Sequence, residues 1–209
     1  MNEFSLLDWK RKIFEIYSIV RNEENSEFSW NKWVYNRKNL FENHAESPIA
    51  SYHNKKNIIK FYPYNHMFSF YPNVVRLSEK KIISLNLGSD GTIKIFPAYK
   101  TKGLKKVLEK ELIIYRIHGY AGGLLLPFTD LGTRKGGEHY EGGRYIIDTV
   151  KGADLGSNKN KIKIDFNYSY NPSCAYNTKW ICPLVNNENN LNILINAGEK
   201  KPILNKVIE

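Results

Sequence analysis

The sequence of this 209-residue chain predicts a mainly β fold, an antiparallel β-sandwich or barrel with an N-terminal helical extension. From about residue 57 onward, short runs rich in β-branched and aromatic residues are separated by turn residues, which is the pattern of strands. No helical pattern is interleaved with these runs, so antiparallel pairing is favoured over a parallel sheet with crossover helices. We therefore expect a helical extension over residues 1–45 and a β-rich domain over residues 46–209.

Two helices are expected in the extension. Apolar residues recur at helical spacing over residues 5–21, and Ser5 with Asp8 resembles a capping box at the start of this helix. A second helical stretch covers roughly residues 30–41. We expect both helices to pack on the protein's own core, and docking on a partner chain is the alternative.

The β-rich domain carries the strand-like runs. They cover residues 58–62, 67–71, 81–87, 92–96, 112–117, 124–128, 144–147, 161–166 and 191–195. The sequence Gly88-Ser89-Asp90-Gly91 separates the third run from the fourth and favours a tight hairpin turn, because these residue types tolerate the backbone angles that such turns need.

The charge composition argues against a specific reader of nucleic acid. The formal net charge is +10, but 24 of the 31 basic residues are Lys and only 7 are Arg. Base readout and bidentate phosphate contacts favour Arg, and the lysines form no dense block. A solvated basic surface is expected, and weak contact with a polyanion is the alternative.

The hydropathy pattern argues against a membrane protein. No apolar run approaches the roughly 20 residues that a helix needs to cross a bilayer. The N-terminal residues also lack the apolar core of a secretory signal. We therefore expect a cytoplasmic location.

A glycine-rich segment over residues 128–145 is the first candidate site. Its glycines can bring backbone N–H groups close to an anion, and Arg144 near its end is the natural anion-binding side chain. The segment carries neither a phosphate-binding loop signature nor a dinucleotide-binding one. A purely structural loop is the alternative.

The run over residues 161–166 is the second candidate. As a strand it places Ile164 and Phe166 on the core face, so Asp165 and Asn167 are expected on the opposite face. A carboxylate and an amide would then meet a ligand or a cation at the edge of the sheet. A solvated face with a turn-forming Asn is the alternative.

The chain has two cysteines, Cys174 and Cys182. If residues 177–179 form a hairpin loop, the two thiols lie opposite each other. Free thiols are expected in a reducing compartment, and two Cys alone do not make a structural zinc site. Structural packing or a local disulfide, redox or nucleophilic chemistry, and metal binding all stay open, since no His has a diagnostic spacing to either thiol.

Several segments together carry a family resemblance. They are Ser47-Pro48-Ile49, Phe61-Tyr62-Pro63, Pro127-Phe128-Thr129-Asp130, Glu138-His139-Tyr140-Glu141-Gly142-Gly143-Arg144-Tyr145, the run from Asp165 to Tyr176, Cys182-Pro183-Leu184, Glu188-Asn189 and Ala197-Gly198-Glu199-Lys200. With them the chain resembles, over roughly residues 45–200, the bacterial and archaeal family called domain of unknown function 1684. The resemblance implies a Thr at position 139, where this chain has His. The resemblance implies a shared site and no established activity.

The resemblance also implies a set of polar residues suited to a small polar pocket. Asp165, Glu138 and Glu199 are the candidate catalytic acid–base groups, and Arg144 would hold the anionic end of a ligand. The remaining candidate ligand-binding residues are Tyr140, Asn167, Tyr170, Asn171, Tyr176, Glu188 and Asn189.

We therefore expect a cytoplasmic protein that binds a small polar or anionic molecule in its C-terminal half, where hydrolase-like acid–base chemistry is one use of such a site. Whether it is an enzyme, and which cofactor or metal it takes, stays open; oxygen-rich donors would favour Mg²⁺ or Ca²⁺ over zinc. The alternative is a non-catalytic interaction or scaffold protein whose basic surface meets a polyanion or an acidic partner.

Overall fold

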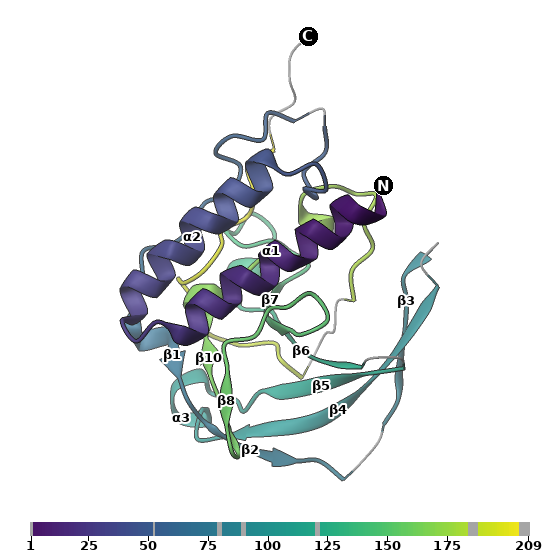
Figure 1. The fold of residues 1–209 in the computed structure, drawn as a ribbon. Helices are drawn as coiled ribbons and strands as arrows, with labels where there is room; N and C mark the ends of the chain where they lie inside the picture. The colour runs from purple at the N-terminus through teal and green to yellow at the C-terminus, as the bar shows by residue number, and fades with distance from the viewer. Residues whose placement is uncertain are drawn as a thin grey trace.

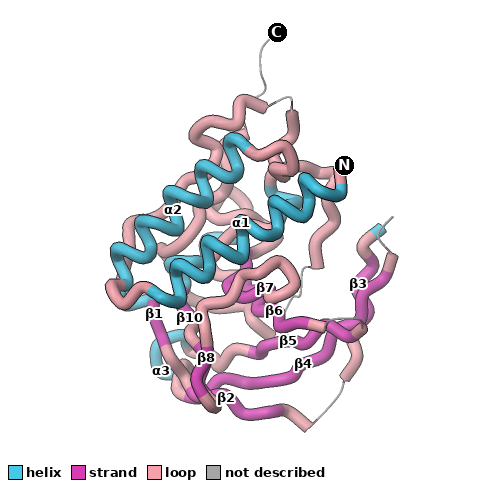
Figure 2. Tube along the Cα trace, in the orientation of Figure 1, coloured by secondary structure: helices cyan, strands magenta, loops and turns pink. Residues whose placement is uncertain are grey.

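The computed structural model describes residues 2–51, 53–78, 81–88, 91–119, 122–183 and 188–204. Two antiparallel helices, α1 (Glu3–Asn22) and α2 (Ser26–Asn43), pack side by side above a curled sheet (Figure 1). Long loop segments occupy much of the region between the helix pair and the sheet (Figure 2). The polar residues discussed below come mostly from these loops and from the strand ends next to them.

The helices begin at capping residues that lie upstream of the predicted starts. The side-chain oxygen of Asn2 accepts the N–H groups of Phe4 and Ser5 at 3.0 and 3.3 Å, and Asn25 caps α2 in the same way. Such a side chain satisfies N–H groups that have no partner inside the helix. The predicted capping box of Ser5 and Asp8 is therefore wrong, because both residues lie inside α1.

The sheet confirms the predicted fold class: it is antiparallel and curls into a half-barrel, with the helices N-terminal to it. Its strand order is β7-β6-β5-β4-β2-β9-β8, with β3 paired to β4, and a separate pair joins β1 to β10. Every strand pair in the described part of the chain is antiparallel. The strands are β1 (Ser69–Phe70), β2 (Asn73–Arg76), β3 (Ile83–Asn86), β4 (Thr92–Lys102), β5 (Ile113–His118), β6 (Gly123–Phe128), β7 (Arg144–Asp148), β8 (Ser157–Asn158), β9 (Lys161–Ile162) and β10 (Ile164–Asp165), and a short helix, α3 (Lys105–Leu108), follows β4.

The predicted hairpin is present between β3 and β4. The N–H of Leu87 donates to the carbonyl of Gly91 at 2.7 Å and closes it. Of the predicted turn residues, Ser89 and Asp90 lie outside the described residues.

Several strand predictions fail where the backbone pairs irregularly. β4 is longer than predicted, because a register shift against β5 between Pro97 and Tyr99 accommodates the proline. Residues 58–62 and 191–195 are not strands; each is held by isolated backbone bonds to another loop. The predicted strand over residues 161–166 is divided between β9 in the large sheet and β10 in the small one.

The helices and the sheet share one hydrophobic core, as predicted. Tyr17 of α1 and Trp33 of α2 are buried in the same cluster as Tyr115 of β5 and Ile146 of β7. Trp33 packs edge-on against the ring of Tyr168, which belongs to a loop beneath the helices, at a centroid distance of 5.3 Å.

Within the described residues, no helix has both the length and the apolar character that crossing a bilayer requires.

Candidate functional site

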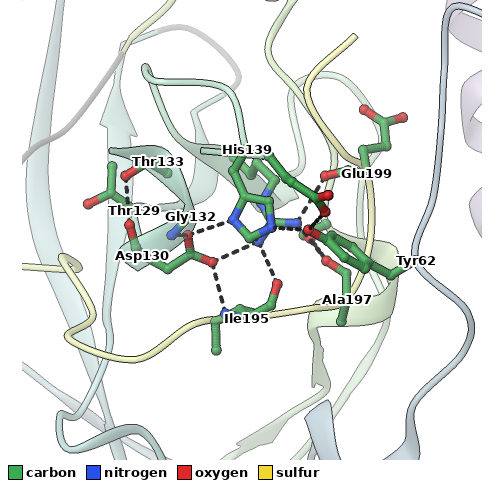
Figure 3. Close-up of polar contacts among 12 residues, drawn as sticks. Tyr62, Thr129, Asp130, Gly132, Thr133, His139, Ile195, Ala197 and Glu199 are labelled. Atoms are coloured by element: carbon green, nitrogen blue, oxygen red, sulfur yellow. Dashed lines mark hydrogen bonds and ion pairs between the residues drawn. The ribbon is translucent and has the colours of Figure 1, made fainter. Parts of the chain in front are cut away.

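A buried polar cluster lies where the end of β6, the start of β7 and the C-terminal segment 195–199 meet (Figure 3). Asp130 follows β6 and bends the chain into a short 3-10 helix, since its carboxylate accepts the N–H of Gly132 at 2.9 Å. Arg144 opens β7, and the register of the two strands pairs it with Phe128. The hairpin therefore brings Arg144 next to Asp130.

Arg144 is fully buried and its guanidinium binds groups of the protein itself. Nη1 donates to the carbonyls of Ala197 and Glu199 at 2.5 and 3.0 Å. Nη2 donates to Asp130 Oδ2 at 2.9 Å and to the carbonyl of Ile195 at 3.1 Å. The structure thus corrects the expectation that Arg144 faces a ligand: it anchors the C-terminal segment to β7.

Asp130 is the carboxylate on which this cluster is centred. Its Oδ1 lies 2.6 Å from His139 Nδ1, and its Oδ2 also accepts the N–H of Ile195 at 3.2 Å. Burial alone would raise the pKa of Asp130, but the hydrogen bond to His139 and the charge of Arg144 outweigh it and hold the pKa below its usual range. Asp130 is therefore a stable buried carboxylate.

His139 connects this carboxylate to the surface. Its Nε2 lies 3.0 Å from the hydroxyl of Tyr62, and that hydroxyl donates to Glu138 Oε2 at 2.7 Å. Lys200 Nζ donates to the same Glu138 oxygen at 2.9 Å. Asp130 and His139 are buried, Tyr62 is 9% exposed, and the Glu138 side chain is 65% exposed, so the path runs from the interior to solvent.

The imidazole has little room to move. A methyl group on Gly132 would lie 2.2 Å from His139 Nδ1, so only glycine allows the ring its position. The hydroxyl of Tyr62 has one proton and two neighbours, His139 and Glu138, that can accept it. Burial, followed by the hydrogen bond to Glu138, raises the pKa of Tyr62, which keeps it a phenol and a proton donor.

Glu199 belongs to a second buried cluster. Its carboxylate pairs with Arg37 of α2 and accepts the hydroxyl of Tyr176 at 2.8 Å and the N–H of Asn171 at 2.7 Å. The Arg37 guanidinium lies 4.9 Å from the ring centroid of Tyr170. These contacts tie α2 to the C-terminal segment and leave Glu199 fully buried.

Asp165 and Asn167 form a third group, which closes a loop. The Asn167 side chain accepts the N–H of Asn65 at 2.8 Å and donates to the carbonyl of Asn65 at 2.8 Å and to Asp165 Oδ1 at 2.8 Å. Both residues are fully buried, so the expectation that they share an outer face is wrong. The reason is that the chain leaves β10 in a 3-10 helix instead of continuing as a strand.

Asn189 and Glu188 lie apart from these clusters. The side chain of Asn189 accepts the N–H of Ile113 at 2.8 Å and donates to the carbonyls of Ile113 and Pro127 at 2.9 and 2.8 Å. It thereby holds its own loop against the sheet. Glu188 is exposed and accepts the hydroxyl of Tyr115 at 3.0 Å.

The two thiols meet, although the predicted hairpin is wrong. The chain forms a short 3-10 helix, Ser173–Ala175, followed by a turn, and the N–H of Cys174 donates to Cys182 Sγ at 3.3 Å. Tyr140 donates to Cys174 Sγ at 3.6 Å. In the described part of the chain, no group of three or more His, Cys, Asp or Glu side chains is placed to hold a metal ion.

The predicted site residues therefore form several clusters. No hydrogen bond or ion pair among the described residues joins the Asp165 side chain to that of Glu138 or Glu199. The sequence-based prediction also omitted Asp130, Tyr62 and Arg37. Asp130 and Tyr62 stand inside the family-like segments, which was the available signal, whereas nothing in an amphipathic helix marks Arg37 as an interior cation.

The family described as "Protein of unknown function (DUF1684)" matches residues 36–200. The chain belongs to the DUF1684 family. A search of curated proteins finds no match. Among solved structures, an uncharacterised protein of Haloarcula marismortui, determined by NMR in solution, is similar to this DUF1684 chain: the sequences are 22% identical, the match covers 85% of this chain and 97% of that one, and the TM-score is 0.55. This likeness supports the fold.

Proposed function

We propose that the protein binds a small polar or anionic molecule at the surface formed by Tyr62, Glu138 and Lys200, and that Tyr62 exchanges a proton with it. The observation that carries this proposal is the continuous hydrogen-bonded path from Asp130 through His139 to Tyr62. In this arrangement a carboxylate orients an imidazole, and the second nitrogen of the imidazole contacts a hydroxyl. Proteins use such an arrangement to move protons at that hydroxyl.

Each residue of the path has a distinct part in the proposal. Lys200 supplies the cation that attracts an anionic group, and its ammonium lies 4.3 Å from the ring centroid of Tyr62. Glu138 is ionised, since its hydrogen bonds to Tyr62 and then to Lys200 lower its pKa, and it accepts a proton or a ligand hydroxyl. Arg144 is a positioning residue that holds Asp130 in place.

This proposal changes the sequence-based assignment of the acid–base groups. Of the three candidate carboxylates, Asp165 and Glu199 are fully buried, whereas Glu138 is exposed. The proposed proton transfer therefore involves Glu138 and the phenol of Tyr62. A hydrolase-like reaction, in which a hydroxyl of the ligand gains or loses a proton, is the reaction class that this pair suits. A cytoplasmic location is part of the same proposal.

A thermal-shift panel tests the proposal. Small carboxylates, phosphates, sugars and nucleotides are each added to the wild-type protein and to Tyr62→Phe, Lys200→Gln and Lys201→Gln. Lys201 pairs with Glu141 at 3.1 Å on the same surface and takes no part in the path, so it is the matched control. We expect at least one anionic compound to raise the Tm of the wild type and of Lys201→Gln, because a ligand that binds only the native state stabilises it.

The same compound is expected to lose most of its effect with Tyr62→Phe and Lys200→Gln. If no compound raises Tm, or if Lys201→Gln loses the effect as fully as Lys200→Gln, the proposed site is wrong. Binding of random nucleic acid that weakens steeply with salt, together with silence across the panel, would favour the alternative of a basic interaction surface.

A further inference from the structure

The two cysteines form a pair that the proposed ligand site does not use. Both thiols are free and partly exposed. Cys174 lies in the short 3-10 helix Ser173–Ala175, and the turn that follows brings Cys182 back against it. The backbone N–H of Cys174 donates to Cys182 Sγ at 3.3 Å, so the two residues are in direct contact.

The surroundings of the pair make its two sulfurs different. The neighbouring Cys174 thiol, with a smaller effect of the Lys151 charge, lowers the pKa of Cys182. The same neighbour relation raises the pKa of Cys174, whose sulfur accepts the hydroxyl of Tyr140 at 3.6 Å. Tyr140 thus donates to Cys174, and the backbone N–H of Cys174 donates to Cys182.

We infer that Cys174 and Cys182 are a reactive dithiol that forms a reversible disulfide by exchange with small-molecule disulfides. Cys182 is the attacking residue, because its sulfur accepts the backbone N–H of Cys174, which stabilises negative charge there. Cys174 is the resolving residue, because the 3-10 helix Ser173–Ala175 holds its backbone N–H against Cys182 Sγ.

The exchange takes place in two balanced steps. The Cys182 thiolate attacks one sulfur of a disulfide RSSR, the S–S bond breaks, and one RS⁻ leaves and takes up a proton. Cys174 then loses its proton and attacks Cys182 Sγ in the mixed disulfide, which releases the second RS⁻. The net reaction converts the protein dithiol and RSSR into the protein disulfide and two RSH, so the small disulfide is the oxidant.

Oxidised glutathione is the probe for the test. The full-length protein, Cys174→Ser and Cys182→Ser are each incubated with it near neutral pH and analysed by intact mass, with samples quenched over time. We expect the wild type to lose two hydrogen atoms and keep no glutathione. Cys174→Ser is expected to accumulate one glutathione adduct, because no resolving thiol remains.

The third variant tests the order of attack. We expect Cys182→Ser to react at least about tenfold more slowly than Cys174→Ser. In Cys174→Ser the backbone N–H of residue 174 still donates to Cys182 Sγ, whereas in Cys182→Ser the burial that raises the pKa of Cys174 remains. Thermal unfolding of each variant shows whether it is folded. A wild type that ends with two adducts and no internal disulfide overturns the inference without reference to any variant, and equal rates for the two variants overturn the assignment of Cys182 as the attacking residue.

Discussion

Asp130, in the loop after β6, and Asp165, at the end of β10, are both buried carboxylates, yet their surroundings differ. Asp130 is matched by a cation, since Arg144 and His139 lie at 2.9 and 2.6 Å from its two oxygens. Asp165 has only Asn167 on one oxygen, its other oxygen has no hydrogen-bond partner in the described structure, and Lys163 is 3.8 Å away. The hydrogen bonds and charge around Asp130 lower its pKa, whereas burial raises the pKa of Asp165.

The difference shows which buried polar group can take part in chemistry. Asp130 is paired with a cation, so it keeps its charge and can orient His139. His139 in turn contacts Tyr62 near the surface. Asp165 has no such path in the described structure; its contacts close a loop around Asn65. Composition alone does not separate the two, because both are single Asp residues at or just after the end of a strand.

Asp130→Asn is expected to have the largest effect on stability. It removes the charge that compensates buried Arg144, and breaking such a pair costs about 3–5 kcal/mol. The free energy of unfolding is measured by urea denaturation at pH 7 for the wild type, Asp130→Asn and Asp165→Asn. A loss below about 1 kcal/mol in Asp130→Asn would show that the cluster does not hold the C-terminal segment as described.

The pH dependence of the same variant sharpens the comparison. Asp130 has a lower pKa in the folded state than in the unfolded state, so its contribution is present above the unfolded value of about 3.9 and is lost as the pH falls through the folded value. The wild type should therefore lose stability steeply in acid, and Asp130→Asn should lose less over the same range. Parallel acid curves for the two proteins would contradict the pKa assignment.

Asp165→Asn is expected to have a small effect of the opposite sign. The amide oxygen still accepts from Asn167, and the poorly matched buried charge is gone, so the variant should stay within about 1 kcal/mol of the wild type at pH 7 and should tend toward greater stability. Because the folded pKa of Asp165 is raised, wild-type stability falls as the pH rises through it, and the relative gain of the variant should grow over that range. A loss in the free energy of unfolding as large as that of Asp130→Asn would contradict the distinction between the two carboxylates.

The sequence predicts the regular parts of this fold well. The periodicity of apolar residues predicts the helices and most strands. This periodicity depends on which face of each element is buried, and it holds for different arrangements of the elements. The errors lie at residues 58–62 and 191–195, whose apolar character is that of strands. These segments pair with distant loops by isolated bonds, and no local pattern carries that information.

The sequence predicts several residues of the candidate site but not their arrangement in space. Arg144, Glu138 and Glu199 belong to adjoining clusters, but the interior position of Arg144 depends on the C-terminal segment that folds over it. The position of Asp165 is also set by the backbone, because the strand ends at Asp165 and a 3-10 helix begins at Phe166. Some of the contacts that bury Arg144 come from residues far along the chain. For example, its guanidinium donates to the carbonyl of Ala197, which is 53 positions away.

The central claim, that Tyr62 links His139 to a ligand surface, is tested most directly by NMR of protein labelled with ¹³C at the tyrosine Cζ. The Tyr62 and Tyr64 resonances are assigned with Tyr62→Phe and Tyr64→Phe and compared in the wild type and in His139→Thr, which removes the imidazole. We predict that His139→Thr and the strongest stabilising compound of the panel each shift the Tyr62 resonance and leave that of Tyr64 in place. A Tyr62 resonance that responds to neither would contradict the account.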